Sequence, residues 1–213
     1  MRLRLYNFFR SGTSHRLRIA LNLKGLAYDY VPVDLRRGEH EASAFREINP
    51  QGLVPALEVD GRIYTQTPAI LEWLEEVVRE PPLLPRDPEA RAYVRTIAAI
   101  VGCDIHPVNN RRILETLRHE YGADQGRIDA WAARWIAAGF DAIEALLARN
   151  GSAPFCMGET PTLAEVYLIP QVESARRFHV DVRRWPRIAA IDAHCSTLDA
   201  FQRAAPHAQP DAD

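Results

Sequence analysis

Residues 9–21 read FRSGTSHRLRIAL and connect a strand pattern to a helical one. The strand pattern is residues 3–6, LRLY, in which apolar and polar side chains alternate as in a half-buried strand. Apolar residues then recur at helical spacing until Gly25, a residue type that often follows a helix C-terminus. Ser11 is therefore expected at the start of a helix, beside Arg10. The free backbone N–H groups and the helix dipole favour an anion there, such as a carboxylate, a phosphate or a thiolate.

The segments that follow predict a small mixed sheet. Residues 28–33 form a second strand pattern, and a strand, a helix and a strand that pack together form a right-handed unit with parallel strands. Residues 54–59 predict a third strand, and Asp60-Gly61 is a two-residue turn into a fourth. Thr67 as N-cap and Pro68 at the first helical position predict the next helix. This order of elements is typical of a thioredoxin-like domain.

The character of the chain changes after about residue 80. Residues 80–88 read EPPLLPRDP, and four prolines in so short a segment cannot continue a helix. Beyond them the strand signals disappear and long helical patterns dominate. We therefore expect a domain over residues 1–80, a proline-rich linker over 81–88 and an all-helical domain over 89–213. The tail after Pro206 is rich in proline and aspartate, which predicts that it is frayed.

The composition is that of an ordinary soluble globular protein, with 47% hydrophobic and 25% charged side chains among 213 residues. A net charge of −2 gives no electrostatic argument for binding nucleic acid or a membrane surface. Apolar runs fall short of the roughly 20 residues that span a bilayer, and no signal core is apparent, so a cytoplasmic location is expected. The three cysteines, Cys103, Cys156 and Cys195, are odd in number and far apart in the sequence. They fit a reducing compartment and indicate neither disulfides nor a metal site. Neither a P-loop nor a GxGxxG motif is present, so no nucleotide is implied.

The first turn has the chemistry to stabilise a thiolate. The hydroxyl of Ser11 can donate a hydrogen bond to a bound sulfur, with Thr13 as an alternative donor. A redox role is excluded, because no cysteine precedes Cys103 and the thiol must therefore come from outside. The alternative is that Ser11 only caps a helix. In the same way, the proline of Val54-Pro55 indicates an edge strand, a turn or a cis peptide bond.

Taken together and in this order, these motifs resemble the zeta-class glutathione transferases, the family that contains the maleylpyruvate and maleylacetoacetate isomerases. The resemblance covers most of the chain, in particular residues 49–57, 69–76, 158–165 and 170–178. The usual Ser-Ser-Cys of the zeta turn is Ser-Gly-Thr at residues 11–13, so a role for that cysteine does not apply. The RSGTSHR form looks closest to bacterial glutathione-dependent maleylpyruvate isomerases. Glu165 replaces the usual aspartate of a capping box, a change that this motif tolerates.

The resemblance implies a glutathione transferase fold, with an α/β thioredoxin-like N-terminal domain, an all-α C-terminal domain and glutathione as cofactor. It implies a cis bond before Pro55, which leaves the backbone of Val54 free to pair with the cysteinyl part of glutathione. Gln66 and Thr67 would hold the γ-glutamyl carboxylate. The implied glutathione-binding residues are Ser11, His40, Val54, Pro55, Gln66, Thr67, His106 and Asn110.

The implied reaction is the cis–trans isomerisation of a small dicarboxylate, maleylpyruvate to fumarylpyruvate, by thiolate addition, bond rotation and elimination. Negative charge on two carboxylates and a transient enolate requires several fixed cations. The implied catalytic residues are Ser11, Thr13, Arg10 and Arg177, and the implied substrate-binding residues are Arg10, Arg111 and Arg177. Arg112 and Arg176 are neighbouring alternatives, and any one arginine can instead be a solvated surface charge.

Three other functions stay open. Maleylacetoacetate presents the same maleyl end and is the nearest alternative substrate. A general conjugating transferase should have a more apolar second site with fewer arginines. A non-catalytic binding module predicts the loss of Ser11, Val54-Pro55 or Gln66-Thr67, and all of them are present. The resemblance also implies a homodimer.

Overall fold

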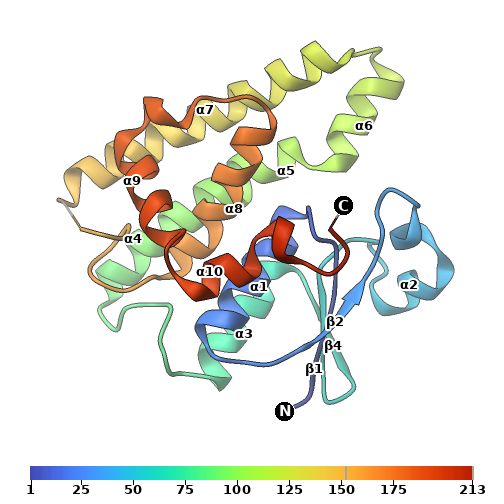
Figure 1. Cartoon of the computed structure of the whole chain (residues 1–213), viewed down its shortest axis with the longest axis horizontal. Coiled ribbons are helices and arrows are strands. Elements are labelled where there is room, and N and C mark those ends of the chain that lie inside the picture. Colours follow the sequence, from blue (N-terminus) through green and yellow to red (C-terminus); the bar gives the residue numbers. More distant parts are fainter. Residues whose placement is uncertain (152, 213) are drawn as a thin grey trace. The chain divides into compact units, whose positions relative to one another are not determined.

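In the computed structural model, residues 1–151 and 153–212 are described, and they form two compact units (Figure 1). One unit comprises Met1–Leu83 together with the segment from Thr197 onward, and the other comprises Leu84–Ser196. Among the described residues, no helix is long and apolar enough to cross a membrane.

The first unit is built on a four-stranded sheet with the strand order β2-β1-β3-β4. Its strands are β1 (Leu3–Asn7), β2 (Asp29–Pro32), β3 (Ala56–Val59) and β4 (Arg62–Thr65). Strand β2 runs parallel to β1, whereas β3 is antiparallel to both β1 and β4. The helices are α1 (Gly12–Leu23), α2 (Ser43–Ile48) and α3 (Thr67–Val77). The predicted thioredoxin-like fold is confirmed.

Turn residues define the ends of these elements as the sequence predicts. Gly25 has a φ of 65° just after α1, a left-handed conformation that closes helices. Asp60 and Gly61 have φ values of 48° and 86°, the positive values that a tight hairpin between β3 and β4 requires. One boundary prediction is wrong: the N-cap of α3 is Gln66, with a φ of 67°, and not Thr67. Because of this left-handed backbone at Gln66, the helix begins at Thr67, one residue earlier than predicted.

Among its described residues, 84–151 and 153–196, the second unit contains helices joined by turns and loops, and no strand. Its α-helices are α4 (Pro88–Ala99), α5 (His106–Asn109), α6 (Arg111–Glu120), α7 (Gln125–Arg149), α8 (Leu163–Arg177) and α9 (Pro186–Cys195). A π-helical turn, Ile100–Ile105, lies between α4 and α5. It packs closely against α7, where a Cβ on Gly139 would lie 2.3 Å from Ile105.

The C-terminal segment packs with the first unit, which the sequence did not indicate. It contains α10 (Asp199–Ala204) and a short 3-10 turn, Pro206–Ala208. Asn22 on α1 donates a hydrogen bond to the Ala200 carbonyl at 2.9 Å. The expectation of a frayed tail is wrong, because long-range contacts hold the backbone that local composition leaves free.

Candidate active site

The start of α1 carries a chain of hydrogen bonds with a defined direction. Ser11 is the N-cap, and its Oγ accepts from the backbone N–H of Ser14 at 3.2 Å. Thr13 Oγ1 donates to the Val54 carbonyl at 3.0 Å, and this carbonyl can only accept. A hydroxyl has one hydrogen, so the 2.9 Å contact between Ser11 Oγ and Thr13 Oγ1 must be donated by Ser11. Only the Ser11 hydrogen can therefore turn to an external acceptor without breaking the bond to Val54.

Val54 and Pro55 join this cluster from a distant part of the chain. Their peptide bond is cis, as the family resemblance implied. Both residues are buried, and the Val54 carbonyl receives the Thr13 hydrogen bond. The structure thus brings Ser11, Thr13, Val54 and Pro55 together at the N-terminal end of α1.

A second group of polar atoms lies at the N-terminus of α3. Gln66 is exposed, and its side-chain amide donates to the side-chain oxygen of Gln51. Thr67 is buried in the first turn, where free N–H groups favour an anion. Gln51 is a neighbour that the residue-by-residue reasoning did not single out. The available signal was its place in the motif over residues 49–57.

The remaining candidates of the first unit are Arg10 and His40. Arg10 follows the buried pair Phe8 and Phe9 and is exposed to solvent next to Ser11. His40 is partly buried, with Nε2 3.4 Å from a carboxylate oxygen of Glu41.

An arginine of helix α1, Arg18, is fully buried. Arg18 donates to the side-chain oxygen of Asn7 and to the Phe9 carbonyl, each at 2.9 Å. Burial lowers the pKa of Arg18 to about 10, which still leaves it charged near neutrality. Sequence reasoning missed Arg18 because an arginine on a helix is usually solvated. Residue spacing gave no signal for it, because residues 14–21 of α1 are all buried and not only one face of the helix.

The second unit holds the other candidates. His106 begins α5 and is partly buried. Asn110 is the N-cap of α6, and its side-chain oxygen accepts from the Ile113 backbone N–H at 3.2 Å, so a structural role is observed. Arg111 and Arg112 follow it and are both exposed.

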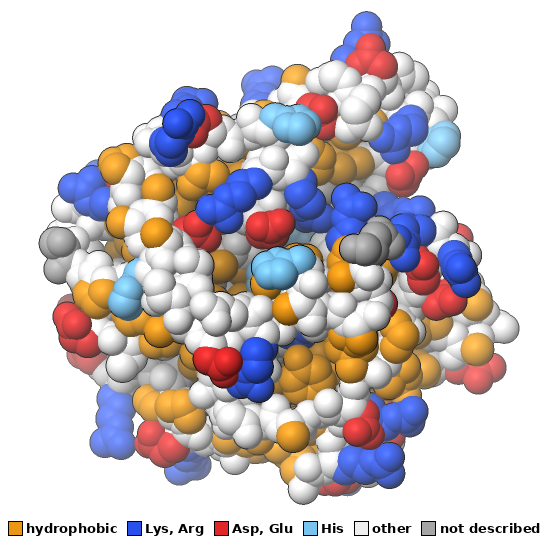
Figure 2. Space-filling model, in the orientation of Figure 1, with side chains coloured by type: hydrophobic (Ala, Val, Ile, Leu, Met, Phe, Trp, Pro, Cys, Tyr) orange, Lys and Arg blue, Asp and Glu red, His pale blue; other side chains and the backbone are white. Residues whose placement is uncertain are grey.

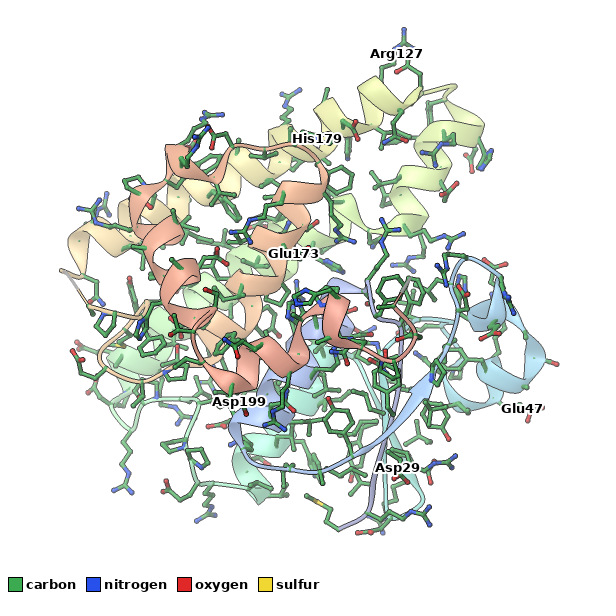
Figure 3. All side chains as sticks on the ribbon, viewed as in Figure 1. Asp29, Glu47, Arg127, Glu173, His179 and Asp199 are labelled. Carbon is green, nitrogen blue, oxygen red and sulfur yellow. The ribbon has the colours of Figure 1, made fainter. Side chains whose placement is uncertain are left out.

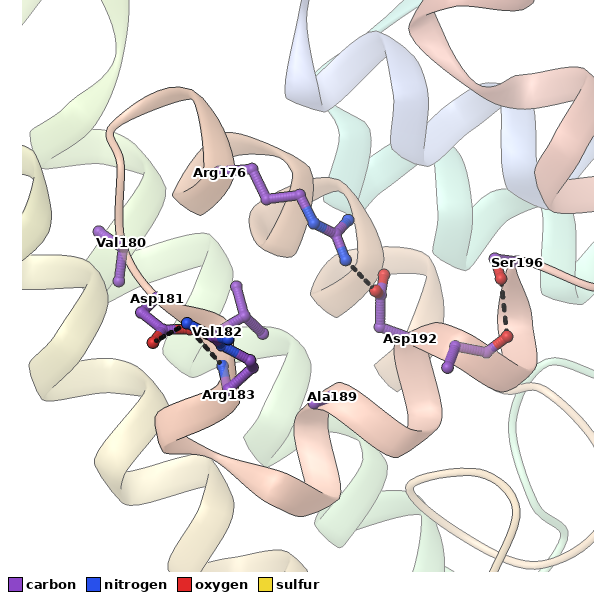
Figure 4. Close-up of a pocket in the computed structure, with 9 residues that line it drawn as sticks. Arg176, Val180, Asp181, Val182, Arg183, Ala189, Asp192 and Ser196 are labelled. Carbon is purple, nitrogen blue, oxygen red and sulfur yellow. Dashed lines mark hydrogen bonds and ion pairs between the residues drawn. The ribbon is translucent and has the colours of Figure 1, made fainter.

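The two adjacent arginines at the end of α8 differ in their surroundings. Arg176 pairs with Asp192 and lies 3.8 Å from Glu173, and it lines a surface pocket of about 540 Å³ (Figure 4). Arg183 and Asp181 form another ion pair in this pocket. Arg177, the last residue of α8, is exposed. The guanidinium of Arg176 thus has carboxylate partners on both α8 and α9.

The thiols of Cys156 and Cys195 are buried and have raised pKa values. Burial raises the pKa of the Cys156 and Cys195 thiols, with a further contribution from the nearby carboxylate of Glu165. That carboxylate accepts from the backbone and the hydroxyl of Thr162, which confirms the predicted capping box. Cys103 is exposed. Among residues 1–151 and 153–212, no group of three or more His, Cys, Asp or Glu side chains could hold a metal ion.

The charge distribution is mixed. The face in Figure 2 carries basic and acidic side chains close together, as a net charge of −2 leads one to expect.

A thioredoxin-like unit with a cis-proline beside a helix N-terminus, and a separate all-helical unit, together define the class of the glutathione transferases. The family model for the glutathione S-transferase N-terminal domain matches residues 10–77, and that for the C-terminal domain matches residues 127–193. The chain belongs to the glutathione S-transferase family.

The chain is similar to proteins of the zeta class. The chain is 60% identical over 210 residues to a maleylpyruvate isomerase of Ralstonia sp., with 98% of this chain and 99% of the relative covered. A holo structure of a maleylpyruvate isomerase, a bacterial zeta-class enzyme, matches with a TM-score of 0.97 and 60% identity, over 99% of this chain and 100% of that one. The maleylacetoacetate isomerase of Anaeromyxobacter dehalogenans, solved with dicarboxyethyl glutathione and citrate in its active site, matches with a TM-score of 0.88 and 42% identity, over 100% and 94%.

Proposed function

We propose that this chain is a glutathione-dependent cis–trans isomerase that converts maleylpyruvate to fumarylpyruvate. The observation that carries the proposal is the hydrogen-bond direction at α1, which leaves the Ser11 hydroxyl able to donate to a sulfur from outside the chain. The relative with 60% identity, a maleylpyruvate isomerase, supports the choice of substrate.

The residues present suit glutathione. Val54 precedes a cis-proline, and its backbone groups can pair with the cysteinyl part of a peptide. Gln66 has a strained, left-handed backbone before the anion-binding first turn of α3, and such strain is frequent at ligand sites. We assign Gln66 and Thr67 to the γ-glutamyl carboxylate, with His40, His106 and Asn110 as further contacts.

The residues of the chain stabilise charge at each stage. Bound glutathione supplies a thiolate that adds reversibly to the alkene, so that the double bond becomes a single bond and can rotate. Ser11 and the N-terminus of α1 favour the thiolate over the thiol. Arg10, Arg111 and Arg177 would hold the two carboxylates and offset the negative charge that develops on the substrate keto oxygen.

A second candidate substrate is maleylacetoacetate. It has the same maleyl end, and a maleylacetoacetate isomerase with 42% identity binds a dicarboxyethyl derivative of glutathione. The cluster at α1 acts on the part that the two substrates share, so the reaction type is the same for both.

We further propose a cytoplasmic homodimer with a proline-rich linker between its domains. The exposed thiol of Cys103 and the two buried, unbridged cysteines are compatible with a reducing compartment. The family resemblance supports the dimer.

The direct test is the absorbance of enzymatically generated maleylpyruvate, followed with and without glutathione. We expect its loss to require both the protein and glutathione. Glutathione binding without turnover of maleylpyruvate or maleylacetoacetate would contradict the isomerase function and favour a conjugating or binding role.

A further inference from the structure

The loop that leads into Ser11 is held by groups from distant parts of the chain. The backbone N–H of Phe9 donates to Asp211 Oδ2 at 3.2 Å, and its carbonyl accepts from Arg18 Nη2 at 2.9 Å. The Phe8 carbonyl accepts from Ser11 N at 3.0 Å and from Arg18 at 3.4 Å. Phe9 is only 6% exposed, so its backbone groups need these partners to avoid a buried, unsatisfied state.

Asp211 is fixed from a second direction by β2. The hydroxyl of Tyr30 donates to the other oxygen of the Asp211 carboxylate. Burial and this bond raise the pKa of Tyr30, so the hydroxyl stays protonated and remains a donor. The Asp211 carboxylate therefore links the strand β2 to the backbone of the loop.

The C-terminal segment itself is folded so that it presents Asp211. Gln209 donates to the carbonyls of Arg203 and Ala205, at 2.7 and 2.8 Å, and this turns the chain after α10. Arg18 donates from Nε to the Ala204 carbonyl at 2.9 Å, so that one buried guanidinium holds both the segment and the Phe9 loop.

The same segment also packs on the apolar residues around the candidate site. Ala212 packs against a buried cluster that includes Phe8, Phe9 and Val54. This apolar cluster thus includes residues of the loop before Ser11 and the residue before the cis-proline. The polar and apolar contacts of the C-terminal segment therefore reach both backbone segments that carry Ser11, Thr13, Val54 and Pro55.

We propose that Asp211 is a positioning residue, which fixes the Phe9 backbone and so holds the Ser11 hydroxyl, two residues further on, in place for the sulfur of glutathione. The inference rests on the proposed function for the identity of the thiol. Displacing a reacting group by about 1 Å can lower a rate about 100-fold, so control of this loop matters for catalysis. The C-terminal segment then contributes to the site by positioning Ser11.

Two variants of Asp211 separate positioning from charge. Asp211→Asn can still accept from Phe9 N–H with its oxygen and can donate to the Tyr30 oxygen with its amide. Asp211→Ala loses both bonds. Tyr30→Phe keeps the ring and removes only the hydrogen bond from the Tyr30 hydroxyl to Asp211, so Asp211 keeps its bond to Phe9 and the effect should be smaller. Asp199→Ala is the matched control, because this carboxylate belongs to the same segment (Figure 3) and pairs with Arg203 at 2.8 Å.

The experiment measures three quantities on each full-length variant. They are kcat/KM for maleylpyruvate, the pKa of the bound glutathione thiol from thiolate absorbance, and amide exchange of residues 8–11. For Asp211→Ala we expect faster exchange, a thiol pKa higher by about one pH unit and kcat/KM lower by about tenfold at neutral pH. Tyr30→Phe should move these quantities in the same direction by less. Asp211→Asn and Asp199→Ala should stay within about twofold of the wild type.

A melting temperature lowered in Asp211→Ala with an unchanged thiol pKa and unchanged turnover would overturn the proposal, because the residue would then be only structural. The proposal is also overturned if Asp211→Asn is as impaired as Asp211→Ala, because the charge of the carboxylate, and not its hydrogen bonds, would then be what matters. A wild-type protein that binds glutathione but does not isomerise maleylpyruvate would refute the proposed function alone. In that case a raised thiol pKa in Asp211→Ala would still support the positioning role.

Discussion

The direction of the hydrogen bonds at α1 predicts that Ser11→Ala raises the pKa of the bound glutathione thiol, whereas Thr13→Val leaves it unchanged or lowers it. Thr13 gives its only hydrogen to the Val54 carbonyl, at 3.0 Å, and Ser11 gives its own to Thr13, at 2.9 Å. When a thiolate is present, Ser11 must exchange a neutral acceptor for a charged one. Thr13 competes with the sulfur for the Ser11 hydrogen.

The magnitudes follow from these two bonds. A hydrogen bond to a charged acceptor contributes about 1.5–3 kcal/mol, and a neutral one contributes about 0.5–1.5 kcal/mol. Ser11→Ala removes the difference, about 1 kcal/mol, so the thiol pKa should rise by roughly one pH unit. Thr13→Val removes only the competing acceptor, so the thiol pKa should stay the same or fall by up to about one pH unit.

Stability provides an independent check on the same variants. Thr13→Val loses two neutral hydrogen bonds, which lowers the free energy of unfolding by about 1–3 kcal/mol. Ser11→Ala loses the N-cap bond of α1 and the bond to Thr13, which together lower it by about 1–3 kcal/mol. The two variants should therefore lose similar stability, whereas only Ser11→Ala should raise the thiol pKa.

The assay is a pH titration of the thiolate absorbance of bound glutathione, with urea unfolding of each variant. Thr13→Ser keeps the hydroxyl and is the matched control, with both quantities expected near those of the wild type. A thiol pKa that rises as much in Thr13→Val as in Ser11→Ala would refute the assigned direction and make Thr13 a donor to the sulfur.

Two further predictions concern the second unit. Arg177→Ala should lower kcat/KM for maleylpyruvate by about 10–100-fold and leave glutathione affinity unchanged, because a charged hydrogen bond to a carboxylate is lost. Arg176→Ala should keep wild-type turnover. Steady-state kinetics with a glutathione titration check this prediction, and equal losses of kcat/KM in the two variants would refute it. Below the ordinary pKa of a thiol the buried Cys156 and Cys195 cause no pH dependence, but above it the unfolded chain releases protons that the folded chain retains. Each thiol should therefore lower the free energy of unfolding by up to about 1.4 kcal/mol per pH unit above about pH 8.5, and urea unfolding of Cys195→Ala should show a shallower slope, an unchanged slope being the contrary result.

Local signals in the sequence were sufficient for the four strands of the first unit and for the existence of α1 and α3. The turn at Asp60-Gly61 and the helix end at Gly25 depend on residue types that tolerate a positive φ, so the backbone follows from composition. The start of α3 was misplaced because the left-handed φ of Gln66 is imposed by its surroundings, which no local pattern reveals.

The C-terminal segment marks the limit of local reasoning. Its proline and aspartate content predicts a frayed end, yet Asp211 bonds to Phe9 and Tyr30 across almost the whole chain. Arg18 belongs to the same problem, since the sequence contains no local sign that its guanidinium is fully buried. Contacts of this separation depend on the finished fold.

The candidate site was also predictable only in part: its residues were, and the contacts between them were not. The motifs indicated Ser11, Thr13, Val54 and Pro55, and the structure groups them. The direction of the hydrogen bonds between them could not come from spacing, because it depends on which atom has a carbonyl for its partner. The difference between the neighbouring arginines at the end of α8 likewise depends on the position of Asp192 in space.

The most direct test of the account is proton NMR of maleylpyruvate incubated with the protein and a small fraction of an equivalent of glutathione. For an isomerase we expect complete conversion to the trans isomer, with many turnovers for each glutathione and the free thiol recovered at the end. A reaction that stops after one equivalent, with a stable glutathione conjugate as its product, would contradict an isomerase and identify a conjugating transferase.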